Sequence, residues 1–470
     1  MRQKSLFHSS ITKLLYIEFV LFLSCILSCK KPLINLAKLA SNEQWNCLLI
    51  VLDAARYDHF SFAGYFRKTT PHIDNISKQG VYFTNAFSQH SCTDTSIPSM
   101  FAGLYPTNID ASKQIWLVDL FNKLDFNTVI FSENPGVQKS FTFANGFQNY
   151  MEDYPFEKII SAEYNINKTI RSELLYQVKN WIINSKKRFF CYLHLLLPHN
   201  PYFPPEPFNN KFLPNIYDKS LKPTTENLVK IANNEIAISP LQREYIISQY
   251  DANLFYADYI VGYLLDELKK QKVLSRTVVI ITSDHGEAFG EHKLWLHCHS
   301  CYNEMLRIPL IFYFPQSAKI KDIKLNFRVG LIDIMPTLHE LFGFNAKSNY
   351  DGINLLPFFS GLKKPKERVI IGESTTQISA MLGSFKLIRT FRSFQNFKLP
   401  QPDTEQLFDL ESDYNENSDV SALYPEVTLL LKKLIDMYNE KKPNSNSIKE
   451  KLKNIDKITL ERLRSLGYIR

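Results

Sequence analysis

Short runs of consecutive apolar residues recur along the chain and predict buried β-strands. They cover residues 47–52, 127–131, 189–197, 277–282, 308–313 and 369–371. Apolar residues follow one another in these runs with almost no polar alternation, which is typical of strands covered on both faces. The pattern therefore predicts an α/β fold with a parallel or mixed central sheet.

The intervals between these runs carry helical periodicity or polar, loop-like composition. Residues 245–270 repeat apolar side chains at helical spacing, and residues 331–342 do the same. Residues 206–240 are rich in Asn, Pro, Lys and Thr and predict a long surface insertion. Residues 439–457 are polar and Lys-rich and predict a linker before a final helix.

Polar residues stand where several predicted strands end. Asp53, His199 and the pair Asp284-His285 each follow an apolar run directly or within a few residues. Ligands of open α/β sheets bind at the carboxyl ends of the strands. These four residues are therefore candidates for one shared site.

The composition fits a folded globular protein and excludes several other classes. Of 470 residues, 45% are hydrophobic and 22% charged, which excludes a mainly disordered, collagen-like or coiled-coil chain. The net charge of +8 comes from 55 basic and 47 acidic residues mixed along the chain. Without a basic arm or block, we do not expect nucleic-acid binding.

The first 29 residues have the features of an export signal. Arg2, Lys4 and Lys13 precede the apolar run 14–27, which is short for a bilayer span. Cys29 follows a small residue at the end of this run, as in a bacterial lipoprotein signal, and would become the lipidated first residue. A plain cleaved signal and an uncleaved anchor are the alternatives. We expect an exported, membrane-anchored lipoprotein on the periplasmic or outer surface.

Five cysteines remain after such a signal and do not predict a disulfide scaffold. Their number is odd and their spacing matches no disulfide framework; they are Cys47, Cys92, Cys191, Cys298 and Cys301. Cys298 and Cys301 form a lone Cys-x-x-Cys pair, for which a disulfide or two free thiols is a simpler reading than structural zinc.

A cluster of hydroxyl residues opens the apolar stretch after Ser91. It reads Ser91-Cys-Thr93-Asp-Thr-Ser96-Ile-Pro-Ser-Met-Phe-Ala-Gly103-Leu-Tyr-Pro106. Ser, Thr and Asp favour the first positions of a helix, and a hydroxyl there meets the positive end of the helix dipole. This segment is either a simple helix cap or an anion-binding site.

Several motifs together resemble the sulfatase family, in the superfamily of alkaline phosphatase. The resemblance covers residues 44–470 and rests on blocks in the family's order. They are Leu-Ile-Val-Leu-Asp53-Ala-Ala-Arg56-Tyr-Asp58-His59, Thr93-x-x-Ser96-Ile-Pro-Ser-Met-Phe-x-Gly103-Leu-Tyr-Pro106, His194-x-x-x-Pro198-His199, Ser283-Asp284-His285-Gly-Glu-x-x-Gly-Glu-His292-x-x-Trp-x-His297, Asp333-x-x-Pro336-Thr-Leu, Asp351-Gly-x-Asn-Leu-Leu-Pro357 and Leu466-Gly-Tyr-Ile469.

The resemblance implies a fold and a division of the chain. The fold would be an alkaline-phosphatase-like sandwich with a central mixed β-sheet between helices, over residues 42–375. A smaller α+β subdomain, over residues 376–470, would pack a short sheet and a helix against it.

The resemblance also implies a site for one divalent cation. Its ligands would be Asp53, Thr93, Asp284 and His285, and the cation would be calcium, manganese, magnesium or zinc. Such a set of oxygen ligands and one imidazole does not choose sharply among these metals. The family usually has a second Asp after the first, where this chain has Ala54.

The position of the family's nucleophile holds Thr93, counted back from Gly103. Sulfatases oxidise a Cys or Ser at this position to formylglycine, which a Thr cannot form, so no formylglycine is expected. Related pyrophosphatases and phosphoethanolamine transferases use Thr. A metal-activated Thr93 would attack phosphorus, while His199 and His297 would contact the anion or protonate the leaving group. Arg56 would hold an equatorial oxygen.

The resemblance thus implies an ester hydrolase or a phosphotransferase. We expect it to act on an anionic phosphate- or sulfate-type ester carried by a glycan, a lipid or a small molecule, with phosphate esters suiting Thr93 better. Sulfuric ester hydrolysis, as in an arylsulfatase, is the alternative. A second alternative is an inactive binding protein that kept the sulfatase fold.

Overall fold

A computed structural model describes residues 35–134, 137, 143–151, 164–345, 349–392 and 399–440. Cys29, the segment 1–29 and the expected final helix lie outside these residues. In the described part of the chain, no helix combines the length and the apolar character needed to cross a bilayer.

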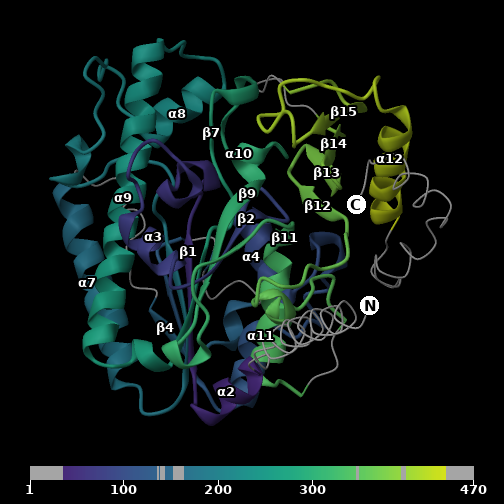
Figure 1. The fold of residues 1–470 in the computed structure, drawn as a ribbon. Coiled ribbons are helices and arrows are strands. Elements are labelled where there is room, and N and C mark those ends of the chain that lie inside the picture. The colour runs from purple at the N-terminus through teal and green to yellow at the C-terminus, as the bar shows by residue number, and fades with distance from the viewer. Residues whose placement is uncertain are drawn as a thin grey trace, which may run out of the picture.

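The central sheet is mixed and has nine strands in the order β10-β2-β9-β6-β1-β5-β3-β4, with β11 also pairing with β2 (Figure 1). β6, β1, β5, β3 and β4 run parallel, and β9 runs antiparallel to both β6 and β2. The strands span Asn46–Leu52 (β1), Gly80–Phe87 (β2), Asn127–Ser132 (β3), Asn149–Met151 (β4), Phe189–Leu195 (β5), Thr277–Thr282 (β6), Arg307–Tyr313 (β9), Ile323–Leu325 (β10) and Val329–Gly330 (β11).

Helices cover both faces of the sheet, which explains why its central strands β1, β5 and β6 are buried throughout and mostly apolar. In β1, Cys47, Leu49 and Val51 pack in one core, and the alternate residues Leu48, Ile50 and Leu52 pack in the other. The first core is closed by α2 (Leu36–Asn42), α4 (Thr93–Ala102), α5 (Leu117–Lys123) and α11 (Ile334–Phe342). The second is closed by α3 (Pro71–Ser77), α7 (Tyr164–Asn184) and α9 (Pro240–Lys270).

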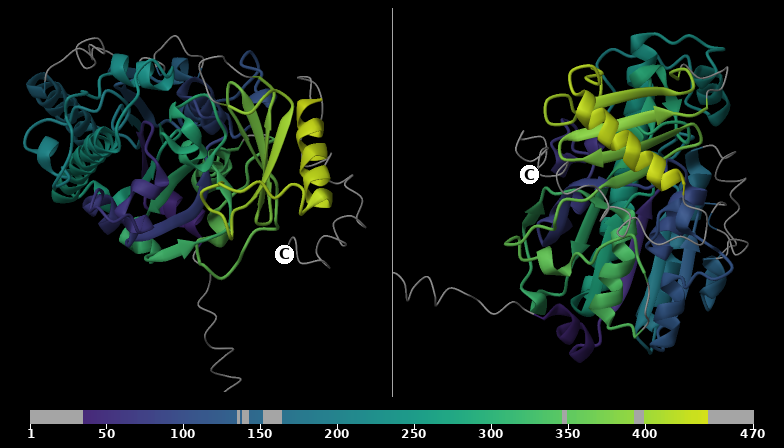
Figure 2. Two further views of the ribbon diagram at one scale, coloured as in Figure 1. Left: turned by 90° about the horizontal axis from the view of Figure 1, so that it is seen from above. Right: turned by 90° about the vertical axis from the view of Figure 1, so that its right-hand side faces the viewer.

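A second, antiparallel sheet forms the expected smaller subdomain. Its strands run in the order β12-β13-β14-β15, spanning Ile370–Glu373, Gln377–Leu382, Phe385–Thr390 and Thr404–Asp409. Helix α12 (Pro425–Asn439) covers its outer face, as both views of Figure 2 show. Its inner face packs against α10 (Asn303–Leu306) of the main body.

Two expectations about strands were wrong. The run 369–371 belongs to the small sheet, where β12 pairs with β13, because a short apolar run does not encode its partner. β2 lies in the central sheet but was missed, because its half-buried positions Tyr82, Thr84 and Asn85 interrupt the apolar run. The predicted insertion 206–240 contains the short helix α8 (Thr225–Ala232).

Glu373 links the small sheet to the main body through backbone hydrogen bonds to Gln89 and Ser91. Its buried side-chain carboxyl group predicts that the stability of the protein depends on pH. Its carboxyl group accepts a hydrogen bond from Tyr438 of α12, and burial raises its pKa to about 7. Because the folded-state pKa exceeds the unfolded value, this contribution is full below about pH 4.5 and is lost as pH rises through about 7. Glu373→Gln should therefore gain up to about 3 kcal/mol over wild type between pH 4.5 and 8.

Urea unfolding at pH 5 and pH 8 measures this difference. Exposed Glu340→Gln on α11 is the control and should show no such change with pH. A Glu373→Gln effect of equal size at both pH values would contradict the prediction.

Candidate active site

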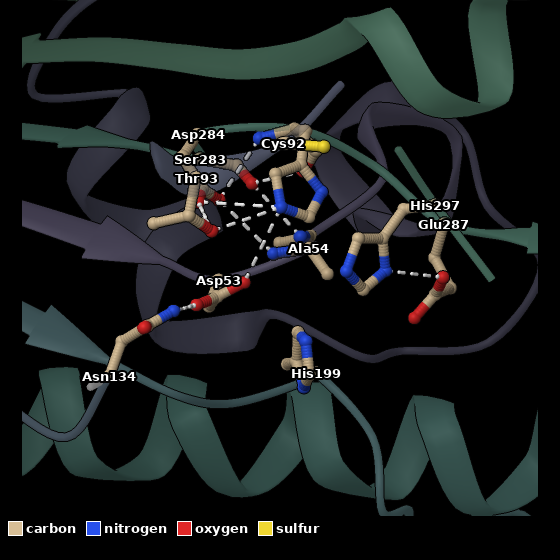
Figure 3. Close-up of polar contacts among 12 residues, drawn as sticks. Asp53, Ala54, Cys92, Thr93, Asn134, His199, Ser283, Asp284, Glu287 and His297 are labelled. Carbon is tan, nitrogen blue, oxygen red and sulfur yellow. Dashed lines mark hydrogen bonds and ion pairs between the residues drawn. The ribbon is translucent and has the colours of Figure 1, made fainter. Parts of the chain in front are cut away.

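Four predicted residues meet at one edge of the central sheet, after the adjacent strands β1 and β6 and after β2, which β9 separates from β6. Asp53 follows β1, Asp284 and His285 follow β6, and Thr93 is the first residue of α4, after β2. We call these four residues the central cluster (Figure 3). The ligand atoms of Asp53, Asp284 and His285 lie within 4.8 Å of one another, and all three residues are buried.

Thr93 places its hydroxyl inside this cluster. Its Oγ1 donates to Asp284 Oδ2 at 2.7 Å and lies 3.2 Å from His285 Nε2. Cys92 is the N-cap of α4, so the hydroxyl sits at the positive end of that helix's dipole. Thr93 is also partly exposed, so a substrate can approach the oxygen.

The donor set fits a divalent cation. Asp53 Oδ1 is buried and has no hydrogen-bond partner among the described residues, which is costly unless a positive charge lies next to it. His285 Nδ1 donates to the carbonyl of Gly286 at 2.8 Å, so Nε2 is the nitrogen that faces the carboxylates of Asp53 and Asp284 and can ligate a cation. This is the arrangement of a metal-binding imidazole whose tautomer is set by its other nitrogen.

Two residues that the sequence did not assign to the site fix Asp53. Its Oδ2 accepts hydrogen bonds from Asn134 and, at 3.1 Å, from His194 Nε2. The other His194 nitrogen lies 2.7 Å from the hydroxyl of Tyr192. Asn134 follows the end of β3. It could therefore have been predicted as a site residue in the same way as Asp53, from its place after the carboxyl end of a strand.

Ala54 stands where the family usually has a second Asp. Its backbone N–H donates to Asp284 Oδ1 at 3.2 Å, and its side chain offers no ligand atom. The carboxylate ligands of the cluster are therefore Asp53 and Asp284 alone among the described residues.

His199 and His297 lie beside the central cluster. The His297 ring is 4.5 Å from that of His285 and 4.8 Å from that of His199. His297 Nδ1 donates to the buried carboxylate of Glu287 at 2.9 Å, and Figure 3 shows its other nitrogen pointing toward the cluster. That nitrogen is the one left to exchange a proton with a substrate.

Glu287 is a further site residue that the sequence analysis did not assign. Burial opposes its ionisation, but the neighbouring His297 outweighs this and lowers the pKa of Glu287. Burial in turn lowers the pKa of His297, although the Glu287 carboxylate opposes this. The second Glu287 oxygen accepts a hydrogen bond from Tyr202 at 2.9 Å, which holds the pair in place.

Arg56 does not reach the position expected of it. Its guanidinium forms a bidentate ion pair with Asp58, at 3.0 and 2.7 Å. It also donates to Glu291 at 2.9 Å and to the Glu287 carbonyl at 3.1 Å. Because these acceptors occupy most of its donors, Arg56 braces the loops around the site rather than holding an anion there.

A disulfide between Cys92 and Cys298 joins the two halves of the site. Its cysteines are 206 residues apart in sequence, and they directly adjoin Thr93 and His297. The spacing of the cysteines alone could not show this pairing, because the Cys298-x-x-Cys301 motif suggested Cys301 as the partner of Cys298. Cys301 is a free, buried thiol whose pKa burial raises to about 12.

Removing this disulfide should reduce turnover. In the double variant Cys92→Ala/Cys298→Ala, the loops carrying Thr93 and His297 lose their covalent link, and we expect kcat to fall by about tenfold to 100-fold. Reduction of the wild-type protein should have the same effect and should leave the double variant unchanged. Cys301→Ala is the control. A double variant with wild-type kcat would show that the link is purely structural.

Comparison with known proteins agrees with this geometry. The family model for sulfatases matches residues 45–344. Arylsulfatase K of Xenopus laevis is 26% identical over 412 residues, covering 76% of this chain and 75% of the relative. Phosphoethanolamine transferase EptA of Escherichia coli (strain K12) is 27% identical over 260 residues, covering 53% of this chain and 42% of the transferase.

Solved structures share the fold. The phosphonate monoester hydrolase of Agrobacterium radiobacter superposes with a TM-score of 0.66 at 18% identity, covering 84% of this chain and 96% of the hydrolase. A sulfatase structure from Bacteroides thetaiotaomicron superposes with a TM-score of 0.67 at 20% identity, covering 84% of this chain and 92% of that sulfatase. The expected α/β sandwich with a smaller C-terminal subdomain is therefore confirmed.

Proposed function

This chain belongs to the sulfatase family, and we propose that it cleaves or transfers a phosphate-type ester group with the Thr93 hydroxyl as nucleophile. The observation that carries this proposal is the Thr93 hydroxyl at the start of α4, hydrogen-bonded to Asp284 and adjacent to His285. The family acts on anionic esters as hydrolases or transferases, and the similarity to EptA extends this to phosphoethanolamine transfer.

Asp53, Asp284, His285 and Thr93 would hold the divalent cation that the family uses. When bound, such a cation supplies neutralisation of the charge on the transferred group and lowers the pKa of the hydroxyl. Calcium, manganese, magnesium and zinc all suit this donor set.

The chain's own residues divide the reaction between them. Asp284 accepts the hydrogen bond of the Thr93 hydroxyl and is placed to receive its proton as the oxygen attacks phosphorus. The new Thr93–O–P bond forms as the bond from phosphorus to the leaving oxygen breaks. His297, held by Glu287, and His199 lie where they would exchange a proton with the leaving or incoming oxygen.

A four-substrate comparison tests the proposed chemistry. Protein lacking residues 1–29 is loaded in turn with calcium, manganese, magnesium and zinc, and assayed with an aryl phosphate, a phosphodiester, a phosphonate ester and an aryl sulfate. We expect a phosphorus ester to give the highest kcat/KM. Turnover of the aryl sulfate alone would overturn the proposal, and silence on all four would favour an inactive binding protein.

Sulfate-ester hydrolysis is the second candidate, favoured by the similarity to arylsulfatase K over three quarters of the chain. It would need a nucleophile other than formylglycine. Thr93 cannot be converted, and Cys92 is engaged in the disulfide with Cys298. The aryl sulfate in the comparison above separates this candidate from the first.

We further propose that the chain is exported and anchored through Cys29. The basic and apolar segment before Cys29 supports this, and so does the disulfide, since disulfides persist mainly in oxidising compartments. Cys29→Ala should move the protein from the membrane fraction to a soluble one or leave an uncleaved precursor. Unchanged fractionation and processing would contradict lipidation.

A further inference from the structure

A cavity of about 510 Å³ lies between the central sheet and the small subdomain, and no residue of the central cluster lines it. Its walls come from the end of β2, the loop 326–328, the segment 364–368 and the β13–β14 turn at Gly383. The opposite end of the small sheet, at Glu373, contacts the backbone of Gln89 and Ser91 near Thr93. The cavity is therefore separate from the candidate active site.

Arg328 brings an unpaired cation to this cavity. Its side chain is only partly exposed, and it has no hydrogen bond or ion pair with any residue that the structure describes. Burial lowers its pKa to about 10, although Glu367 at longer range opposes this. Desolvated guanidinium groups in proteins normally have an anionic partner, because leaving five donors unpaired is costly.

A second arginine, Arg368, also lines the cavity. Arg368 pairs with Asp333 through Nη2, and its buried Nε has no hydrogen-bond partner among the described residues. Lys364 and Lys366 stand on the exposed rim, against Glu367 and Glu411, so basic groups exceed acidic ones around the cavity. The unpaired Arg328 thus lies in a space whose lining carries a net positive charge.

We propose that this cavity binds an oxyanion group, namely a phosphate, sulfate or carboxylate, beside the side chains of Arg328 and Arg368, which both line it. Either arginine can donate to such a group, and the planar guanidinium of Arg328 suits two of its oxygens at once. The cavity is larger than an inorganic anion needs and falls within the range of small-molecule pockets. Phe327 and Tyr414 line it and provide aromatic contacts for an organic body that carries the anion.

Calorimetric titration of the metal-loaded protein with inorganic phosphate tests the second site. We expect two binding events in the wild type. Arg328→Met should abolish one event, or raise its Kd at least tenfold, and leave the other. Asp53→Asn should do the reverse, because it alters only the central cluster. The failure of the second site can thus be distinguished from the failure of the proposed function.

Lys364→Met is the matched control, since it removes one positive charge from the exposed rim and should leave both events in place. Melting adds an independent readout. In Tris chloride without phosphate, Arg328→Met should melt at or above the wild-type temperature, because it removes an unpaired, desolvated charge. Added phosphate should raise the wild-type value further than that of the variant.

Glucose 6-phosphate and glucuronate identify the source of the anion. Tighter binding than inorganic phosphate, with the same dependence on Arg328, assigns the site to a sugar-borne group. Equal affinity assigns it to the free anion. The proposal is overturned if no phosphate event depends on Arg328, or if Arg328→Met melts well below wild type without phosphate.

Discussion

Thr93→Val should lower kcat for the preferred ester by at least about 10³-fold, with little change in the fold. Valine keeps the branched shape of threonine but lacks the hydroxyl that donates to Asp284. No other group would then form the covalent intermediate at the N-terminus of α4. Steady-state kinetics on the substrate with the highest kcat/KM in the four-substrate comparison measures the loss of kcat.

Two further variants make this result specific. Thr95→Val removes a hydroxyl two residues away, which bonds only to Asp94 among the described residues, and should keep kcat within about threefold. Thr93→Ser retains the hydroxyl and should keep much of the activity. Mass spectrometry of acid-quenched wild type should find one phosphoryl group on Thr93. Activity in Thr93→Val near the wild-type level would show that another residue is the nucleophile.

Asp53→Asn should weaken binding of the divalent cation by at least about 100-fold. The amide oxygen can still accept the hydrogen bonds from Asn134 and His194 that Oδ2 now accepts. The atom that replaces the unpartnered Oδ1 is an NH₂ group, which cannot bind a cation. The substitution therefore removes a charge and a ligand with little other change.

Melting with and without added cation measures this effect. At a cation concentration 100 times Kd, wild type should gain about 2.7 kcal/mol of stability, and Asp53→Asn should gain almost none. Asp94→Asn is the control, because His90, Cys92 and Asp94 also lie close together but the Cys92 sulfur is engaged in the disulfide. An equal gain in wild type and Asp53→Asn would place the cation elsewhere.

Much of the central cluster could be predicted from the sequence, for one physical reason. Asp53 and Asp284 follow fully apolar strands, and parallel strands bring their carboxyl ends to one edge of the sheet. Thr93 could not be placed by this rule, because the strand that precedes it, β2, was not recognised in the sequence. Only the motif around Gly103 placed this residue in the site.

Partners that are distant in sequence could not be predicted. Cys92 and Cys298 meet because the chain brings the start of α4 beside the loop after β8 (Trp295–Leu296). Arg56 carries the charge expected of an anion-binding residue, but its guanidinium pairs with Asp58 and Glu291. In both cases the residue type indicated the kind of interaction, but only the fold decided which partner the residue has.

By itself, the sequence determined the class of fold, the family and the edge of the sheet where the chemistry lies, because apolar runs and local motifs are encoded by neighbouring residues. The tertiary structure alone decided which side chains complete the site. Asn134 and His194 hold Asp53, Glu287 orients His297, and a disulfide joins cysteines 206 residues apart. Arg328 lines a cavity and has no ion pair with any described residue. These contacts join separate elements, so their energies depend on distances that only the packed chain sets.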